Sequence, residues 1–169
     1  REKELLDKVK ELVERAKREL ERLVREDDKL NEDLKRRLTK ILKEDSDRIK
    51  EVKERLKDEE VKKKLEEVNK KSEDVIRRIV EESDEASRKS KEVAKKLLDD
   101  LDRVLDEVRK LGGDDKVLED LRKIIEDLLR EIEESLRESR EIIKKLEKRA
   151  KDSLKETEEI IEELERRDT

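Results

Sequence analysis

Apolar residues recur in this chain at intervals of eighteen positions. In the first third, Ala16, Leu34 and Val52 share one register, and the same interval links apolar residues in the other two thirds. Eighteen residues make about five turns at ~3.6 residues per turn, the period of an undistorted α-helix, whereas a seven-residue repeat would impose a left-handed supercoil. The repeat therefore predicts long, nearly straight helices with little supercoiling.

Two interruptions divide the apolar pattern into three segments of 17 apolar residues each. At one of them, Gly112-Gly113 suits the position after a helix end, and Asp114-Asp115 suits the N-cap of the following helix. The other interruption has no glycine, but Asp58 can cap a helix whose first turn is acidic. Equal segments with equal apolar counts predict three equivalent helices, each ~80 Å long at ~1.5 Å per residue. The expected helices cover about residues 2–57, 59–111 and 114–167, within one elongated domain that spans residues 1–169.

The high charge raises the question of disorder, because charged residues make up 61% of the 169 residues. Leu, Ile and Val nevertheless account for 47 residues, about 28%, and the formal net charge is only −5. Disordered chains typically have less than ~20% of such residues and a large net charge. The sequence therefore predicts a folded all-α chain, an antiparallel up-down-up three-helix bundle.

The residue types that carry most enzyme chemistry are missing. The chain has no Cys, His, Met or aromatic residue, which removes the usual nucleophiles, proton shuttles, soft metal ligands and base-stacking platforms. Its balanced charge gives no footprint for nucleic acid or an anionic membrane. No apolar run exceeds two residues, too short for a membrane span or a signal peptide. We predict a soluble protein that is not an enzyme, takes no cofactor or metal, and carries no targeting signal that would assign a compartment.

The neutral polar residues number only 13, and eleven of them lie on or beside the apolar stripes. If the helices fold back about Asp58 and Gly113, position i of the first helix faces roughly 116 − i, and position j of the second faces roughly 226 − j. Two polar sets then form, each with members on all three helices. The first polar set is Asp27, Asn31, Ser83, Ser87, Ser90, Ser135 and Ser139, and the second polar set, five turns away, is Asp45, Ser46, Asn69, Ser72, Ser153 and Thr157.

These polar sets have a structural and a functional interpretation. As structural layers, they would be buried hydrogen-bond networks that enforce register, because misalignment would leave buried polar groups unpaired at ~1 to 3 kcal/mol each. As functional sites, they would be polar pockets for a small ligand or metal between helices. Asp27 and Asp45 lie about five turns apart, and hydroxyl and amide groups make a poor hard-metal site. We favour the structural interpretation, in which a buried Asp must be protonated, paired with Lys or Arg, or placed toward the edge.

The whole chain resembles de novo designed proteins, namely parametrically generated helical bundles with buried hydrogen-bond networks. The resemblance rests on the 18-residue registers, the equal apolar counts, the core of Leu, Ile, Val and Ala, the Gly112-Gly113-Asp114-Asp115 loop and the two polar sets. It implies a hyperstable scaffold without a natural substrate. The glycine-free connection at Lys57-Asp58 departs from the turns that such designs usually carry.

Two functional hypotheses remain open. One is a self-contained monomeric bundle that requires no partner. The other is an interaction module, in which the three helices present a groove to a partner helix or self-associate. Paired apolar residues such as Ile79-Val80 and Leu97-Leu98 widen the stripe and favour the module. However, 17 apolar residues in ~54 amount to about 2.2 per heptad, near a narrow seam, which favours the monomer. A natural spectrin-like spacer or lipid-binding helix bundle would be expected to contain aromatic residues.

Overall fold

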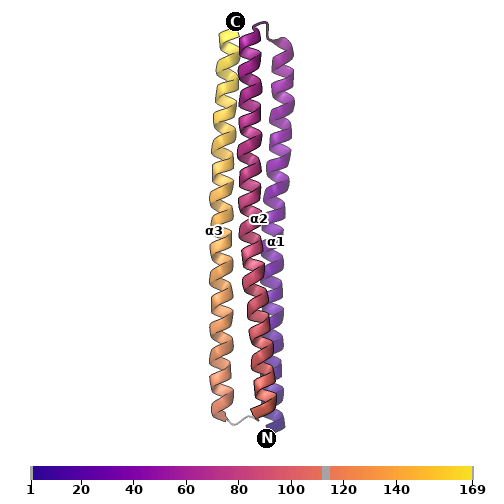
Figure 1. The fold of residues 1–169 in the computed structure, drawn as a ribbon, viewed down its shortest axis with the longest axis vertical. Helices are drawn as coiled ribbons and strands as arrows, with labels where there is room; N and C mark the ends of the chain where they lie inside the picture. The colour runs from indigo at the N-terminus through magenta and orange to yellow at the C-terminus, as the bar shows by residue number, and fades with distance from the viewer. Residues whose placement is uncertain (1, 112–114, 169) are drawn as a thin grey trace. The chain divides into compact units, whose positions relative to one another are not determined.

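The computed structural model of the chain describes residues 2–111 and 115–168, and the described residues form three α-helices. Helix α1 spans Glu2–Arg55, α2 spans Glu59–Leu111 and α3 spans Asp115–Asp168 (Figure 1). The fold is an all-α three-helix bundle, as predicted. The first helix ends two residues before its predicted end, and the third begins and ends one residue after the predicted bounds. The predicted turn at Gly112-Gly113 and the N-cap at Asp114 lie outside the described residues.

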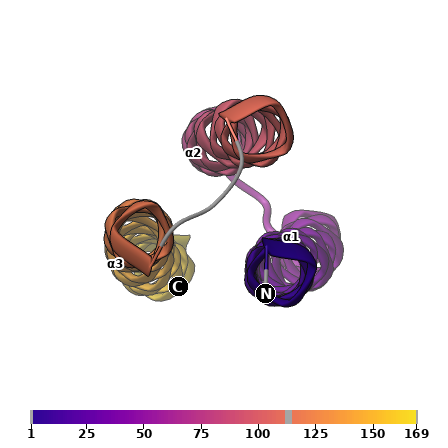
Figure 2. The same cartoon turned by 90° about the horizontal axis from the view of Figure 1, so that it is seen from below.

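The chain divides into two compact units. Unit 1 comprises Arg1–Lys29 with Ala86–Glu141, and unit 2 comprises Leu30–Glu85 with Ile142–Thr169. Each unit contains a segment of each helix, and in unit 1 these segments stand at the corners of a triangle (Figure 2).

Contacts between side chains define the register of α1 against α2 within each unit. In unit 1, Asp28 bonds Ser87, and these residue numbers add to 115. In unit 2, Asn31 bonds Asp84, which gives the same sum, and farther along α1 Lys53 bonds Glu66 with a sum of 119. A nearly constant sum means that the two helices run antiparallel. The observed sums lie within three of the predicted value of about 116.

Helix α3 runs parallel to α1, at a nearly constant offset in residue number. In unit 1, Ser139 bonds Asp27 and lies 112 positions after it. In unit 2, Arg37 and Glu147 are 110 positions apart and form an ion pair of 2.8 Å. The two predicted fold-back relations together imply an offset of about 110 between these helices, so the hairpin topology inferred from the polar sets agrees with the contacts in both units.

Each unit has its own apolar core. In unit 1, one cluster forms around Val13 and Leu101, and another forms around Leu20 and Ile132. In unit 2, one cluster forms around Leu34 and Ile79, and the other contains Leu65. These side chains are at most 1% exposed. Burial of one such side chain contributes roughly 1.5 to 3 kcal/mol, which is how the amphipathic pattern stabilises three helices.

The connection between α1 and α2 is held by two aspartates. The Asp58 carboxylate accepts a hydrogen bond from the backbone N–H of Glu60 at 2.9 Å, and the Asp58 carbonyl accepts one from Lys62 at 3.2 Å. Asp58 is therefore the N-cap of α2, as predicted. Asp168, at the end of α3, accepts from the backbone N–H of Asp58 at 3.0 Å and from that of Lys57 at 3.3 Å. These bonds satisfy backbone donors in a turn that has no glycine.

Replacement of Asp168 by alanine is expected to lower the free energy of unfolding by about 1 kcal/mol, because the N–H groups of Lys57 and Asp58 lose their acceptor and are left to water. The matched control is Asp152→Ala, which removes an exposed carboxylate from the same helix. Guanidinium melts of both variants measure the difference. Equal stability of the two variants would show that the Asp168 contacts contribute nothing.

No helix within the described part of the chain is long and apolar enough to cross a membrane.

Candidate functional site

The buried polar residues are the chemically distinctive feature of the described core. In unit 1, the carboxyl group of Asp27 is 1% exposed and accepts a hydrogen bond of 3.0 Å from the Ser139 hydroxyl. Ser87 is also buried and donates to the Asp28 carboxylate at 3.2 Å. Ser90 is buried and Ser135 is half-buried. Helices α1, α2 and α3 therefore each contribute polar side chains to the interior of unit 1.

The pKa of Asp27 is raised above its ordinary value, chiefly because burial disfavours the charged carboxylate. The neighbouring Asp28 raises the pKa further, whereas the Ser139 hydroxyl, Arg140 and Lys91 lower it. The two cations have other carboxylate partners: Arg140 pairs with Glu26 at 3.1 Å, and Lys91 pairs with Asp28 at 2.7 Å. Asp27 thus stands as the buried acid of unit 1, with a hydroxyl as its bonded partner.

The two members of the first polar set that belong to unit 2 bond to each other. Ser83, which is 0% exposed, donates its hydroxyl hydrogen to the side-chain oxygen of Asn31. The Asn31 amide nitrogen donates to Asp84 at 2.9 Å, and Asp84 also pairs with Lys35 at 3.0 Å. A hydrogen-bonded chain therefore runs from a fully buried hydroxyl, through a buried amide, to an ion pair at the surface.

Asp28 and Asp84 are not among the predicted members of the polar sets, yet both accept hydrogen bonds from them. Each follows a predicted member directly, and each is partly exposed, with 41% and 47% of the side chain accessible. Aspartates at such edge positions look like ordinary surface charges in a chain with 54 acidic residues. Their only sequence signal is their position beside a buried polar residue.

The second polar set, in unit 2, bonds differently. Ser72 and Thr157 are buried, whereas Asp45, Ser46, Asn69 and Ser153 are half-buried. Thr157 donates to the backbone carbonyl of Ser153 at 2.9 Å, and Asn69 donates to Glu73 at 3.4 Å. Both bonds run along a single helix. Thr157 and Asn69 therefore bond within their own helices, whereas bonds between helices were predicted. For Thr157 the reason is that a Thr hydroxyl readily bonds the carbonyl four residues earlier.

Two buried oxygen atoms of the second polar set, Ser72 Oγ and Asn69 Oδ1, have no hydrogen-bond partner. Burial also raises the pKa of Asp45, while Arg48 lowers it and Glu44 raises it. An unpaired buried polar group costs ~1 to 3 kcal/mol. In unit 2, the second polar set is therefore less well satisfied than the pair of Asn31 and Ser83.

The two polar sets are related by the same eighteen-residue interval as the core. The corresponding positions are Asp27 and Asp45, Ser87 and Asn69, Ser90 and Ser72, Ser135 and Ser153, and Ser139 and Thr157. Asn31 and Ser83 have no polar counterpart, because Ile49 and Leu65 occupy the corresponding positions.

The chemistry available in these sets is limited to hydroxyls, amides and isolated carboxyl groups. Among the described residues, no three His, Cys, Asp or Glu side chains are grouped so as to hold a metal ion. Ser139 and Asp27 are a hydroxyl and a carboxyl in contact, but activation of a serine needs a base that is itself oriented by a third group. The arrangement is suited to internal hydrogen bonding.

Open grooves lie between helices in each unit. In unit 1, a groove of about 650 Å³ between α1 and α3 has Leu12, Ile125 and Leu129 in its lining. A second groove of about 370 Å³ lies between α1 and α2 and is lined by Val24 and Leu98, among others. Both grooves expose apolar side chains between helices of unit 1.

Comparison of the chain with protein-family models, with curated proteins and with solved structures finds no match.

Proposed function

We propose that this chain is a designed structural scaffold, a monomeric and hyperstable three-helix bundle with no natural biochemical activity. The observation that carries the proposal is the bond between Asn31 and Ser83, two buried side chains on different helices that satisfy each other. The bond of Ser139 to Asp27 supports it independently in unit 1. Polar groups that hydrogen-bond to each other inside a core stabilise the fold and are not available to a ligand.

In this proposal the first polar set specifies helix register. The apolar core alone specifies register weakly, because Leu, Ile and Val can repack against one another at small cost. A shift of α2 against α1 would separate Ser83 from Asn31 and leave both polar groups buried without partners, at ~1 to 3 kcal/mol each. The buried pair therefore penalises wrong pairings more than it stabilises the right one.

A monomer is the testable part of the proposal. Sedimentation equilibrium at about 10 µM is expected to give the mass of one chain, 20.4 kDa. A dimer at that concentration would need about 7 kcal/mol of binding energy, which a self-contained bundle is not expected to supply. A mass of two or more chains at this concentration would contradict the monomer.

The interaction module is the second candidate, and the groove between α1 and α2 of unit 1 favours it. Leu20, Val24 and Leu98 contribute apolar surface to this groove, and its charged lining consists of three basic residues, Arg25, Lys91 and Lys95, and one acidic residue, Glu21. Such a groove fits the apolar face of an amphipathic helix with acidic flanks. If the interaction module is the correct interpretation, a helical peptide with this pattern should bind unit 1. Titration by calorimetry measures the binding.

A further inference from the structure

Unit 2 carries two isoleucines of α3 that lie off the core. Ile142 is 43% exposed and Ile160 is 41% exposed, whereas the next residues, Ile143 and Ile161, are 5% and 1% exposed. The two exposed side chains are eighteen positions apart, which is about five turns, so they point in the same direction from the helix. This part of α3 therefore has an apolar line outside its core-facing stripe.

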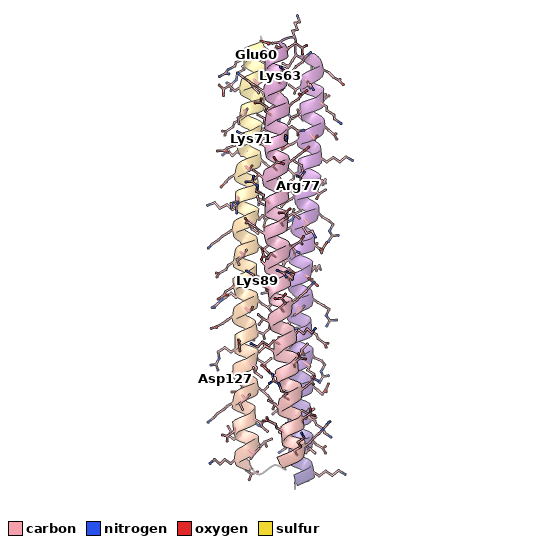
Figure 3. The ribbon with its side chains drawn as sticks, in the orientation of Figure 1. Glu60, Lys63, Lys71, Arg77, Lys89 and Asp127 are labelled. Atoms are coloured by element: carbon pink, nitrogen blue, oxygen red, sulfur yellow. The ribbon has the colours of Figure 1, made fainter. Side chains whose placement is uncertain are left out.

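A groove of about 310 Å³ lies beside Ile160, between α2 and α3 of unit 2. Val68 and Leu164 add apolar surface to it, and Lys71 and Arg167 contribute charged side chains. Figure 3 labels Lys71 on α2. The groove is large enough for an aliphatic side chain that approaches from outside.

We propose that a second copy of this chain docks on this face of unit 2, with its α3 antiparallel to the first. In this arrangement Ile142 of each copy lies opposite Ile160 of the other and enters the groove beside it. A two-fold axis makes the contact self-complementary and closed, because each copy supplies both isoleucines and the groove beside Ile160.

Charge selects this partner and this orientation. Lys145 follows Ile142 by three positions, and Glu156 precedes Ile160 by four, and both side chains are exposed. At ~100° per residue, they lie on the same edge of the isoleucine line. An antiparallel two-fold brings equal edges together, so Lys145 of each copy faces Glu156 of the other. A parallel pairing brings opposite edges together and forms neither ion pair.

The centre of the proposed contact is occupied by Arg149, which lies between the two isoleucines along α3. It forms an ion pair of 2.9 Å with Glu82 on α2, so its charge is neutralised within its own copy. Its hydrocarbon stem can then cover apolar surface. Because the contact includes few apolar side chains, it belongs to the small interfaces, below ~1,200 Å², that are weak. The dimer is therefore expected at about 1 mM protein, and the monomer at about 10 µM.

The test is sedimentation of the full chain from about 10 µM to about 1 mM, where the average mass should rise from one chain toward two. Lys145→Glu replaces two attractive pairs with two repulsive ones and should weaken the dimer at least about tenfold. Lys145→Glu combined with Glu156→Lys restores opposite charges and should bring the affinity back to within about twofold. Lys144→Glu has the same change in net charge at an exposed position far around α3, and it should leave the affinity unchanged.

Loss of the apolar contacts gives a second test. Ile142→Ser with Ile160→Ser should abolish the dimer at about 1 mM, while the thermal midpoint of the monomer changes little because both side chains are already partly exposed. The proposal is overturned if the unsubstituted chain stays monomeric at about 1 mM, or if the charge exchange fails to restore a dimer. A dimer that Lys144→Glu weakens as much as Lys145→Glu would place the contact on another face and would equally overturn the proposal.

Discussion

Replacement of Asn31 by leucine is expected to lower the free energy of unfolding by about 1 to 3 kcal/mol. The loss arises at Ser83, whose hydroxyl is 0% exposed and donates to the Asn31 oxygen. A leucine offers no acceptor, so the hydroxyl remains buried and unpaired. Asp84 loses less, because it is partly exposed and keeps its ion pair with Lys35. Denaturant melts monitored by circular dichroism measure the change.

Two further variants make this prediction specific. Adding Ser83→Ala to Asn31→Leu should recover most of the lost stability, because the orphaned hydroxyl is then removed as well. Asn69→Leu is the matched control in the second polar set. Since the Asn69 side-chain oxygen already lacks a partner, this change should be neutral or stabilising. Equal losses from Asn31→Leu and Asn69→Leu would mean that the bond to Ser83 contributes nothing.

Asp27→Asn is expected to raise the free energy of unfolding at pH 7 by about 1 to 3 kcal/mol, because it removes the cost of burying a charged carboxylate. The asparagine oxygen can still accept the bond from Ser139. The pKa of Asp27 is raised in the folded state, so its protonated form stabilises the fold. This contribution is fully present below the unfolded pKa, near the ordinary value of 3.8, and is lost as the pH rises through the higher folded pKa.

The measurement is a series of urea melts between pH 3 and pH 7 for the unsubstituted chain and for Asp27→Asn. The advantage of the variant should be small at the acid end and should grow toward neutral pH. Asp102→Asn serves as the control, because Asp102 is exposed and pairs with Lys17, so its neutralisation should destabilise slightly at neutral pH. A constant difference between Asp27→Asn and the unsubstituted chain across this range would contradict the prediction.

The fold could be predicted from the sequence because two independent patterns agree. The apolar repeat assigns the helices, and the positions of polar residues such as Asn31 and Ser83 align them. The predicted α1–α3 offset of about 110 compares with 110 for Arg37 and Glu147. Asp58 was identified as an N-cap because capping depends on residues close in sequence. The helix bounds and the helix register can be predicted because several residues indicate each of them.

The individual hydrogen bonds could not be predicted in the same way. Asp168 binds the α1–α2 turn from more than a hundred positions away, and nothing in its local sequence distinguishes it from other aspartates near the end of a helix. Thr157 bonds its own helix, although a partner across the bundle was expected. A register specifies which residues are near one another, but a hydroxyl chooses among several acceptors within reach by angles and distances of a few tenths of an ångström.

The eighteen-residue interval creates decoy alignments. Sliding one helix past another by five turns would return an apolar side chain to most core positions and would superpose most of one polar set on the other. Asn31 and Ser83 have no such duplicate, because Ile49 and Leu65 stand where their copies would be. A slip of α2 by eighteen positions in one direction would place Asn31 opposite Leu65 and Ser83 opposite Val13. A slip in the other direction would place Asn31 opposite Leu101 and Ser83 opposite Ile49. The bonded pair of Asn31 and Ser83 therefore distinguishes the native register from registers shifted by eighteen residues. Its removal should allow chains that exchange helices at high concentration to pair in a shifted register.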